Sequence, residues 1–198
     1  MRKYLLILVL ILVASCKSRQ DLLATSLLSE NGNYQAVIEI PAGTNAKVEY
    51  DKNLRLFSTS LRNGKERIID FLAYPANYGF IPSTYSNPAN GGDGDALDIM
   101  ILSSTLKSGD IVEFIPIGMI KMIDAGEEDF KIIGVPARME LRTIQAENYQ
   151  QLSENYPGAL NILETWFSNY DLEDNTEIQG WSDEKDAIKE IERLRLKL

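Results

Sequence analysis

Three carboxylates lie within six residues of one glycine-rich stretch, at Asp93, Asp95 and Asp98. Glycine lets the backbone bend tightly, so the acidic side chains that flank it come close together. Carboxylates packed this closely repel one another, and inside a cleft they are stabilised by cations held between them. The spacing therefore predicts a site for divalent metal ions. The alternative that stays open for so short an acidic stretch is a solvated turn.

The residues after this acidic stretch indicate a strand. If residues 98–102 are extended, Asp98 and Met100 share one face of the strand while Ile99 points to the other. Asp98 would then stand on a rigid element and face the two loop acids. An EF-hand is excluded, because no Glu follows at the twelfth loop position and a β-type run follows the loop.

The composition removes most other common catalytic chemistries. The chain has no histidine, so the usual general base and the usual zinc ligand are missing. Its single cysteine is near the N-terminus, and no nucleophile elbow, P-loop or dinucleotide fingerprint occurs. Carboxylates are abundant instead, and their oxygens favour Mg²⁺ or Mn²⁺ over softer ions. The candidate acidic residues are Glu39, Glu49, Asp93, Asp95, Asp98, Asp124 and Asp129.

Basic residues are interleaved with these acidic positions along the chain. Lys47, Arg67 and Lys131 could hold an anion beside the metal ions. Metal ions combined with fixed cations are typical of phosphoryl transfer, in which an activated water attacks phosphorus. The residues alone therefore predict a metal-dependent phosphoryl-transfer site.

The first residues have the pattern of an export signal. Two basic residues precede an apolar run over residues 4–14, which is too short to span a bilayer as a helix. The run leads to Cys16 in a sequence similar to a bacterial lipobox. Residues 1–15 are therefore predicted to be a lipoprotein signal peptide and Cys16 to be lipidated, with a plain signal peptide as the alternative. Because Lys17 is not the Asp of inner-membrane retention, we expect an outer-membrane anchor that faces the periplasm.

The rest of the chain is predicted to be a tether and one domain. Residues 16–33 are mostly polar and would connect the lipid anchor to a domain over residues 34–198. The chain has a net charge of −9, and removal of the signal peptide makes it more negative. This charge argues against nucleic acid and anionic membrane surfaces as partners, and it suits a protein whose carboxylates hold divalent metal.

Short segments separated by Gly, Pro and Asn predict a mainly β domain. The expected strands cover residues 36–40, 46–50, 54–58, 67–72, 98–102, 111–120 and 131–135. Strands this short and numerous favour a small closed or partly closed barrel. Pro116 predicts a bulge or a sheet edge inside the sixth segment, since proline cannot donate a ladder hydrogen bond.

Two helices are expected near the C-terminus, packed outside the barrel. The first would begin at Pro157, and the second would follow Ser182 as its N-cap. The apolar stripes are Leu160, Leu163, Phe167 and Tyr170 on the first helix, and Ile188, Ile191 and Leu194 on the second. The predicted fold class is mainly β with flanking helices, α+β.

Several short motifs, in order along the chain, carry a family resemblance. They are residues 38–41, 47–49, 74–82, 93–98 and 121–131. This set resembles the soluble family I inorganic pyrophosphatases over residues 34–198, and D-G-D-x-x-D combined with N-Y-G is specific. The resemblance implies an OB-like five-stranded barrel, Mg²⁺-dependent hydrolysis of pyrophosphate to two phosphates, and a homo-oligomer.

The resemblance also implies roles for the acidic residues. Asp93, Asp98 and Asp129 would bind the tightest metal ion, with Asp98 bridging to a second. Asp95 would be the general base that deprotonates the water between those two ions. Asp124, together with Asp129, would bind a third metal ion that arrives with the substrate.

Further roles follow from the same resemblance. Glu39 would bind or orient a further metal ion, Glu49 would position water beside the metal ions, and Tyr78 would donate a hydrogen bond near the catalytic base. The substrate phosphates would contact Lys47, Arg67, Lys131 and Tyr170. From the residues alone, Lys47 and Glu49 also fit a solvent-facing pair on a strand, Arg67 a residue that flanks a strand, and the two tyrosines structural roles.

Two positions depart from the family pattern. Arg67 is one residue from the usual spacing to the N-Y-G box, which leaves Arg62 as an alternative. Asp171 stands where the family commonly has a lysine, so we expect weaker pyrophosphate binding than in lysine-bearing relatives. The alternative is that Asp171 points into solvent and that Lys185 or Lys189 supplies the missing cation.

Two other functions remain as alternatives to a pyrophosphatase. A non-catalytic extracytoplasmic protein that binds divalent metal or pyrophosphate would be expected to have lost several ligands, yet every ligand position carries a carboxylate. A phosphohydrolase for nucleotides or phosphorylated metabolites would need a segment that recognises a base or a sugar, and no such segment is recognisable.

Overall fold

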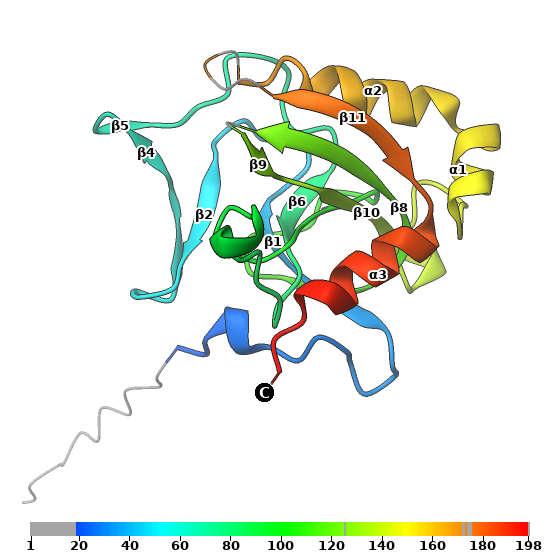
Figure 1. Ribbon diagram of the computed structural model, residues 1–198, viewed down its shortest axis with the longest axis horizontal. Coiled ribbons are helices and arrows are strands. Elements are labelled where there is room, and N and C mark those ends of the chain that lie inside the picture. The colour runs from blue at the N-terminus through cyan, green and yellow to red at the C-terminus, as the bar shows by residue number, and fades with distance from the viewer. Residues whose placement is uncertain (1–18, 125, 172, 174–175, 198) are drawn as a thin grey trace, which may run out of the picture.

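The structure of the chain, a computed structural model, describes residues 19–197 except 125, 172 and 174–175. The predicted signal peptide and Cys16 lie outside the described residues. The described residues form a β-barrel with helices packed on its outside (Figure 1). In this part of the chain, no helix is long and apolar enough to cross a membrane.

Five strands hydrogen-bond in a closed ring. In ring order they are β1 (Tyr34–Ile40), β6 (Asn77–Phe80), β7 (Asp98–Ile101), β10 (Lys131–Pro136) and β8 (Ile111–Asp124). The ring closes because β8 also pairs with β1, and only the β7–β10 pairing is parallel. The predicted OB-like five-stranded barrel is confirmed.

The remaining strands lie beside the barrel. They are β11 (Glu177–Ser182), β9 (Glu127–Glu128), β2 (Val48–Asp51), β3 (Leu56–Thr59), β4 (Leu61–Arg62) and β5 (Lys65–Glu66). Both β11 and β9 pair with β8, which extends the barrel sheet. The pairs β2–β3 and β4–β5 are separate hairpins, and they lie to one side of the barrel (Figure 1).

Three helices cover the outside of the barrel: α1 (Tyr149–Asn155), α2 (Pro157–Phe167) and α3 (Glu184–Leu194). The helices α1 and α2 lie at a different side of the barrel from α3 (Figure 1). The two predicted helices are present as α2 and α3, and Pro157 begins α2. The sequence reading missed α1, because seven residues carry too short an apolar pattern to indicate a helix.

The start of α3 differs from the prediction. Asp183 is the N-cap, and its carboxylate accepts hydrogen bonds from the backbone N–H groups of Lys185 and Asp186. The predicted cap, Ser182, is wrong because Ser182 ends β11 and pairs with Met119 of β8. The strand β11 was not predicted from the sequence, and its last residue occupies the position that was expected to be the cap.

The apolar stripes are confirmed with two exceptions. On α2, Leu160, Leu163 and Phe167 are buried, but Tyr170 lies beyond the last helical residue. On α3, Ile191 and Leu194 are buried as expected, whereas Ile188 is 37% exposed and Ala187 is buried in its place. The difference arises because α3 is rotated so that the row containing Ala187, Ile191 and Leu194 faces the barrel.

The barrel strands carry apolar residues on both faces. Met100 and Ile133 belong to a cluster that includes side chains of α2, while Ile99 and Ile132 belong to a second cluster that includes side chains of α3. The predicted alternation along β7 is therefore confirmed, with Asp98 on the same face as Met100. Burial on both faces makes the strand that carries Asp98 rigid.

Two bulges shape the strands near the site. On β8, Gly118 pairs with Ile133 and Pro116 with Gly134, so one extra residue lies between them and the bulge predicted at Pro116 is confirmed. On β1, the register shifts between Ile38 and Ile40, which leaves Glu39 as the extra residue. A bulge re-aims the side chain that it contains.

Three of the predicted strands differ from the structure, in that each either is absent or begins later than expected. The strand expected over residues 67–72 is absent, and Ile68 makes only an isolated bridge with Ala46. The expected strands over 46–50 and 54–58 are β2 and β3, which each begin two residues later.

The strand β6 was missed because its sequence contains a glycine. A Cβ at Gly79 would lie 1.9 Å from the carbonyl oxygen of Val37, so glycine permits the close approach of β6 to β1. Such an approach depends on a residue distant in sequence.

The segment before β1 lies against the barrel. It contains a short 3₁₀-helix (Leu22–Ala24), and Leu27 is buried in the same apolar cluster as α3. The carbonyl oxygen of Leu27 accepts a hydrogen bond from the backbone N–H of Gln35. The role of residues 16–33 as a tether stays a prediction.

Candidate active site

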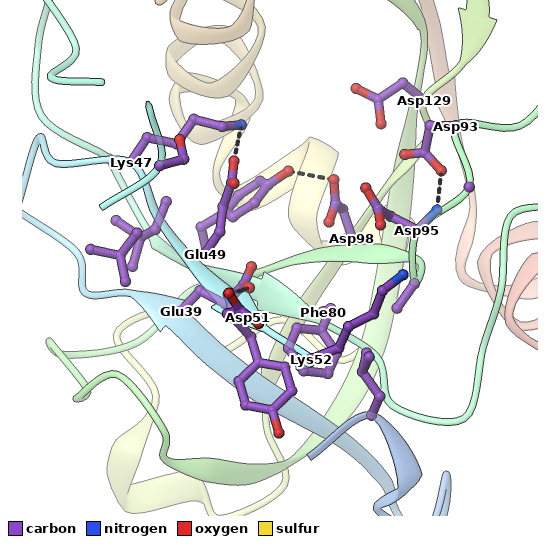
Figure 2. Close-up of a pocket in the computed structure, with 18 of the residues that line it drawn as sticks. Glu39, Lys47, Glu49, Asp51, Lys52, Phe80, Asp93, Asp95, Asp98 and Asp129 are labelled. Atoms are coloured by element: carbon purple, nitrogen blue, oxygen red, sulfur yellow. Dashed lines mark hydrogen bonds and ion pairs between the residues drawn. The ribbon is translucent and has the colours of Figure 1, made fainter. Parts of the chain in front are cut away.

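The side chains that the sequence predicts for the site line one cavity of about 650 Å³ (Figure 2). The lining includes Glu39, Lys47, Glu49, Arg67, Tyr78, Asp93, Asp95, Asp98, Asp124, Asp129, Lys131 and Tyr170. These residues come from all five strands of the barrel ring, from β2 of a hairpin, from loops, and from the segment that follows α2. The fold thus brings together every predicted catalytic, metal-ligating and phosphate-contacting position.

Asp98 is held by two hydrogen-bond donors on neighbouring strands. The hydroxyl of Tyr78, on β6, donates to Asp98 Oδ2 at 2.5 Å. Lys131 lies opposite Asp98 in the parallel pairing of β7 with β10, and its ammonium group donates to the same oxygen. The ammonium group also donates to Asp129. Lys131 therefore joins two carboxylates that the sequence assigns to one metal site.

The loop that carries Asp93 and Asp95 is fixed by backbone hydrogen bonds to Ser86. Gly94 N–H donates to Ser86 O, and Ser86 N–H donates to Asp95 O, both at 2.8 Å. Asp93 Oδ1 accepts the backbone N–H of Asp95 at 3.0 Å (Figure 2). Gly94 has a φ of +88°, which L side chains rarely adopt. Glycine here is the reason that two acids so close in sequence both line the cavity.

Burial and mutual repulsion raise the pKa values of the acidic residues. Burial raises the pKa of Glu39 to about 8, although its Oε1 accepts the backbone N–H of Tyr50 at 2.7 Å. Burial, with the charges of Asp98 and Asp129 added, raises the pKa of Asp93 to about 6. Burial and the charge of Asp98 likewise raise the pKa of Asp95. These carboxylates are destabilised as anions, which is the condition that a bound cation relieves.

Two further pKa shifts come from the same cluster. Burial raises the pKa of Asp129, and the charge of Lys131 only partly opposes this effect. Burial would lower the pKa of Lys131, but the charges of Asp129 and Asp98 outweigh burial and raise it. Lys131 is therefore held in its charged form at the centre of the carboxylates.

The donor set fits a hard divalent cation. Carboxylate oxygens are the ligands that Mg²⁺ prefers, and a bound cation would offset the burial that raises the pKa values of Glu39, Asp93, Asp95 and Asp129. Among the residues that the structure describes, no three of these acids are already arranged to ligate one ion. Lys131 engages one oxygen of Asp98 and one oxygen of Asp129, so a single ammonium group is the counter-charge of both carboxylates.

Basic side chains form the opposite wall of the cavity. Lys47 Nζ lies 3.7 Å from Glu49 Oε1 (Figure 2). Arg67 Nη1 lies 3.9 Å from the same oxygen. Lys47 and Arg67 are mostly buried, whereas the Glu49 side chain is half exposed. A solvent-facing pair at Lys47 and Glu49 is therefore wrong for Lys47. This wall is suited to bind an anion.

The two positions that depart from the family pattern, Arg67 and Asp171, both have defined places in the structure. Arg67 lines the cavity, and Arg62 is not among the described lining residues. Asp171 is not in solvent: its side chain is 10% exposed and pairs with both arginines. Neither Lys185 nor Lys189 is among the described residues that line the cavity, and Lys189 pairs with Asp186 on α3. The proposed substitution by a lysine of the last helix is therefore wrong.

Tyr170 combines a structural and a site position. Its ring stacks on Trp166 with 4.7 Å between ring centroids, and the residue also lines the cavity. Tyr170 lies in the irregular segment after α2, because the helix ends at Phe167.

The sequence reading missed three charged residues that line the cavity: Asp51, Lys52 and Glu127. Asp51 Oδ1 accepts backbone N–H groups of Asn53 and Leu54 at 2.7 and 2.8 Å, so it shapes the turn between β2 and β3. Lys52 extends toward the side of the cavity that carries the acidic loop (Figure 2), and its charge opposes the rise in the pKa of Asp95. The alternation of charged residues from Lys47 onward was the available signal.

Comparisons with known proteins agree with this site. Residues 36–197 match the family described as inorganic pyrophosphatase. The inorganic pyrophosphatase of Synechocystis is 35% identical over 77% of this chain and 83% of its own length.

Solved structures give the same result. The inorganic pyrophosphatase of Thermus thermophilus superposes with a TM-score of 0.76 and 27% identity, over 88% of this chain and 97% of that one. The type I enzyme of P. falciparum gives a TM-score of 0.75 and 28% identity over 85% of this chain, which spans 59% of that longer chain. With a family match across most of its residues and these relatives, the chain belongs to the inorganic pyrophosphatase family.

Proposed function

We propose that this chain hydrolyses inorganic pyrophosphate to two phosphates, with Mg²⁺ as its metal ion and Mn²⁺ as a substitute. The observation that carries the proposal is the convergence of all predicted acidic and basic site residues on one cavity. The relatives support it, because they are named inorganic pyrophosphatases and are matched over most of their length. Retention of a carboxylate at every ligand position argues against a non-catalytic binding protein.

The acidic residues divide into those that hold metal and one that moves a proton. Asp93, Asp98 and Asp129 would hold the tightest ion, and Asp98, at the strand end, would bridge to a second. Asp124 would hold a further ion with Asp129. When bound, Mg²⁺ offsets the negative charge of the substrate and lowers the pKa of a water molecule.

Further assignments concern Glu39 and Glu49. Glu39 would bind or orient a metal ion from the wall beneath β2, where its Oε1 already accepts the N–H of Tyr50. Glu49 is half exposed beside Lys47, and it would position water.

Asp95 is positioned to accept the proton of the attacking water. Its carboxylate lines the cavity on a fixed loop, and burial raises its pKa, which makes it a stronger base than an exposed Asp. The water oxygen forms a bond to one phosphorus while the bond from that phosphorus to the bridging oxygen breaks. The second phosphate leaves with the bridging oxygen. Tyr78 holds Asp98 by its hydrogen bond, which fixes the carboxylate beside the base.

The basic wall orients the anionic substrate. Lys47 and Arg67 on this wall and Lys131 among the carboxylates bring positive charge to the cavity, and Tyr170 adds a hydroxyl-bearing ring. Fixed cations stabilise the charge that develops on the phosphoryl oxygens and on the departing phosphate. This concentration of charge suits a small, highly charged phosphoanhydride.

The direct test is phosphate release from pyrophosphate with Mg²⁺ at neutral pH. ATP and a phosphate monoester serve as comparison substrates, and Asp95→Asn serves as the matched inactive variant. We expect pyrophosphate to be hydrolysed much faster than either comparison substrate. Comparable rates on all three substrates, or no release from pyrophosphate, would reject the proposal.

We also propose that the mature protein is anchored in the cell envelope by a lipid at Cys16, in the outer membrane and facing the periplasm. Support comes from the N-terminal sequence, in which an apolar run ends at the only cysteine. Family resemblance supports assembly into a homo-oligomer.

A further inference from the structure

Asp171 binds two arginines with both of its carboxylate oxygens. Arg62 forms a fork, with Nη1 donating to Oδ1 at 3.0 Å and Nη2 lying 2.9 Å from Oδ2. Arg67 Nη2 donates to Oδ2 at 2.8 Å. The backbone N–H of Glu173 donates to Oδ1 at 3.2 Å. The side chain of Asp171 is only 10% exposed, so this carboxylate is a largely buried acceptor for two guanidinium groups.

Arg67 connects Asp171 to the cavity. One of its terminal nitrogens, Nη2, is held by Asp171, while the other, Nη1, lies 3.9 Å from Glu49 in the cavity wall. The guanidinium plane is rigid, so holding one nitrogen sets the direction in which the other points. Arg62, by contrast, comes from β4 and reaches Asp171 from outside the described lining.

We propose that Asp171 is a positioning residue that fixes Arg67 for phosphate binding, and that Arg62 offsets the negative charge of Asp171. The proposal rests on the proposed function, because the anion bound is pyrophosphate. The family's lysine would add a cation at this position. This chain instead carries an acid there and adds a second arginine from the β4–β5 hairpin.

The proposal reverses the effect expected from charge alone. An isolated aspartate near the site would repel the anionic substrate, so its neutralisation would tighten binding. In the structure the carboxylate lies between two guanidinium groups, which together carry more charge than it does. Neutralising it would leave Arg62 and Arg67 to repel each other, and Arg67 would lose its anchor. Substrate binding would therefore weaken.

Arg62 Nη1 also donates to the exposed Glu173 Oε2 at 3.0 Å, but its effect on Arg67 is exerted through Asp171. If Arg62 is removed alone, Asp171 keeps its charge and pairs with Arg67 alone, which reduces the positive charge that Arg67 offers to phosphate. If Asp171 is already neutral, loss of Arg62 removes a repelling cation and does no further harm. The two residues should therefore show strong non-additivity.

The test is a double-mutant cycle with Asp171→Asn, Arg62→Gln and the double variant. KM and kcat for pyrophosphate are measured at saturating Mg²⁺ and constant ionic strength, together with Tm for each protein. We expect each single substitution to raise KM by about three- to tenfold, the effect of one displaced charge in a partly screened cleft, with kcat within about twofold of wild type. The double variant should show a KM no higher than that of the weaker-binding single variant.

Two outcomes would overturn the proposal: a KM for Asp171→Asn equal to or below that of wild type, or effects of the two substitutions on KM that multiply. If Asp171→Asn does not fold, Arg62→Gln alone decides, since an unchanged KM in that variant also overturns the proposal. Asp186→Asn removes an exposed carboxylate paired with Lys189 on α3 and is the control with unchanged kinetics. Wild-type protein in the same assay tests the proposed function separately. If wild type does not hydrolyse pyrophosphate, the proposed function is rejected. If wild type hydrolyses it and the variants have the same KM as wild type, only this inference is rejected.

Discussion

Lys131 lies directly across from Asp98 in the parallel pairing of β10 with β7, and its ammonium group, on a side chain only 4% exposed, donates to Asp98 Oδ2. The same group donates to Asp129, so one buried cation serves two acids assigned to metal binding. This pairing gives the site an internal counter-charge. Metal ions and Lys131 therefore compete for the same carboxylates.

The first prediction follows from that competition. In the presence of EDTA, Lys131→Met should destabilise the protein by about 3–5 kcal/mol, because the largely buried carboxylates of Asp98 and Asp129 lose the cation that pairs with them. Mg²⁺ should then raise the Tm of the variant by more than it raises that of wild type, since the ion now replaces the lost charge. Thermal unfolding with and without Mg²⁺ measures both effects. Lys185→Met, at an exposed position of α3, is the control, and a smaller Mg²⁺ effect in Lys131→Met would contradict the prediction.

The second prediction separates proton transfer from metal binding. Asp95→Asn should fold, bind Mg²⁺ and lose about 10²- to 10⁴-fold in kcat, the usual contribution of a positioned general base. Near-wild-type turnover at saturating Mg²⁺ would remove Asp95 from the mechanism.

The third prediction concerns the proposed bridging ligand. Asp98→Ala should weaken Mg²⁺ binding itself, because it removes a carboxylate shared between two ions and the acceptor of the Tyr78 and Lys131 hydrogen bonds. Isothermal titration with Mg²⁺ in the absence of substrate measures this directly. Affinity equal to that of Asp95→Asn would show that Asp98 is not a ligand.

The fourth prediction is a pH dependence of stability. Burial opposes ionisation of Asp171, but the hydrogen bonds from Arg62 and Arg67 outweigh it and lower the pKa of Asp171 to about 2. A carboxyl whose folded pKa is depressed adds stability above its unfolded value near 4, and this stability is lost as the pH falls toward 2. Asp171→Asn should therefore be less stable than wild type by about 1 kcal/mol at pH 7, after allowance for solvent screening.

Urea unfolding at pH 7, 5, 4 and 3 checks this dependence. The difference between wild type and Asp171→Asn should stay constant from pH 7 to pH 5 and shrink below pH 4. A difference that grows as the pH falls would have the wrong sign and refute the assignment.

The fifth prediction addresses the N-terminal segment. Cys16→Ala should move the protein from the membrane fraction to the soluble fraction of the cell envelope, because it removes the only cysteine and with it the proposed site of lipidation. Fractionation with metabolic labelling by a fatty acid tests this. Unchanged membrane association together with absent label in wild type would exclude lipidation.

The amino-acid sequence alone is enough to predict the chemistry of the site and the class of the fold. The absence of histidine and the spacing of Asp93, Asp95 and Asp98 left hard cations as the fitting ligands. Alternation along β7 placed Asp98 and Met100 on one face, and the structure confirms it. These features are local, because periodicity, glycine turns and side-chain chemistry act within a few residues.

Elements and contacts that depend on residues distant in sequence become apparent only in the folded structure. Gly79 permits β6 because β1 passes within contact distance, and no local pattern reveals that approach. From the sequence, Asp171 is expected to repel the anionic substrate. In the structure its carboxylate is paired with both Arg62 and Arg67. The effect of a charged residue on substrate binding depends on its distances to all neighbouring charges. Folding sets these distances, here between residues more than a hundred positions apart in sequence.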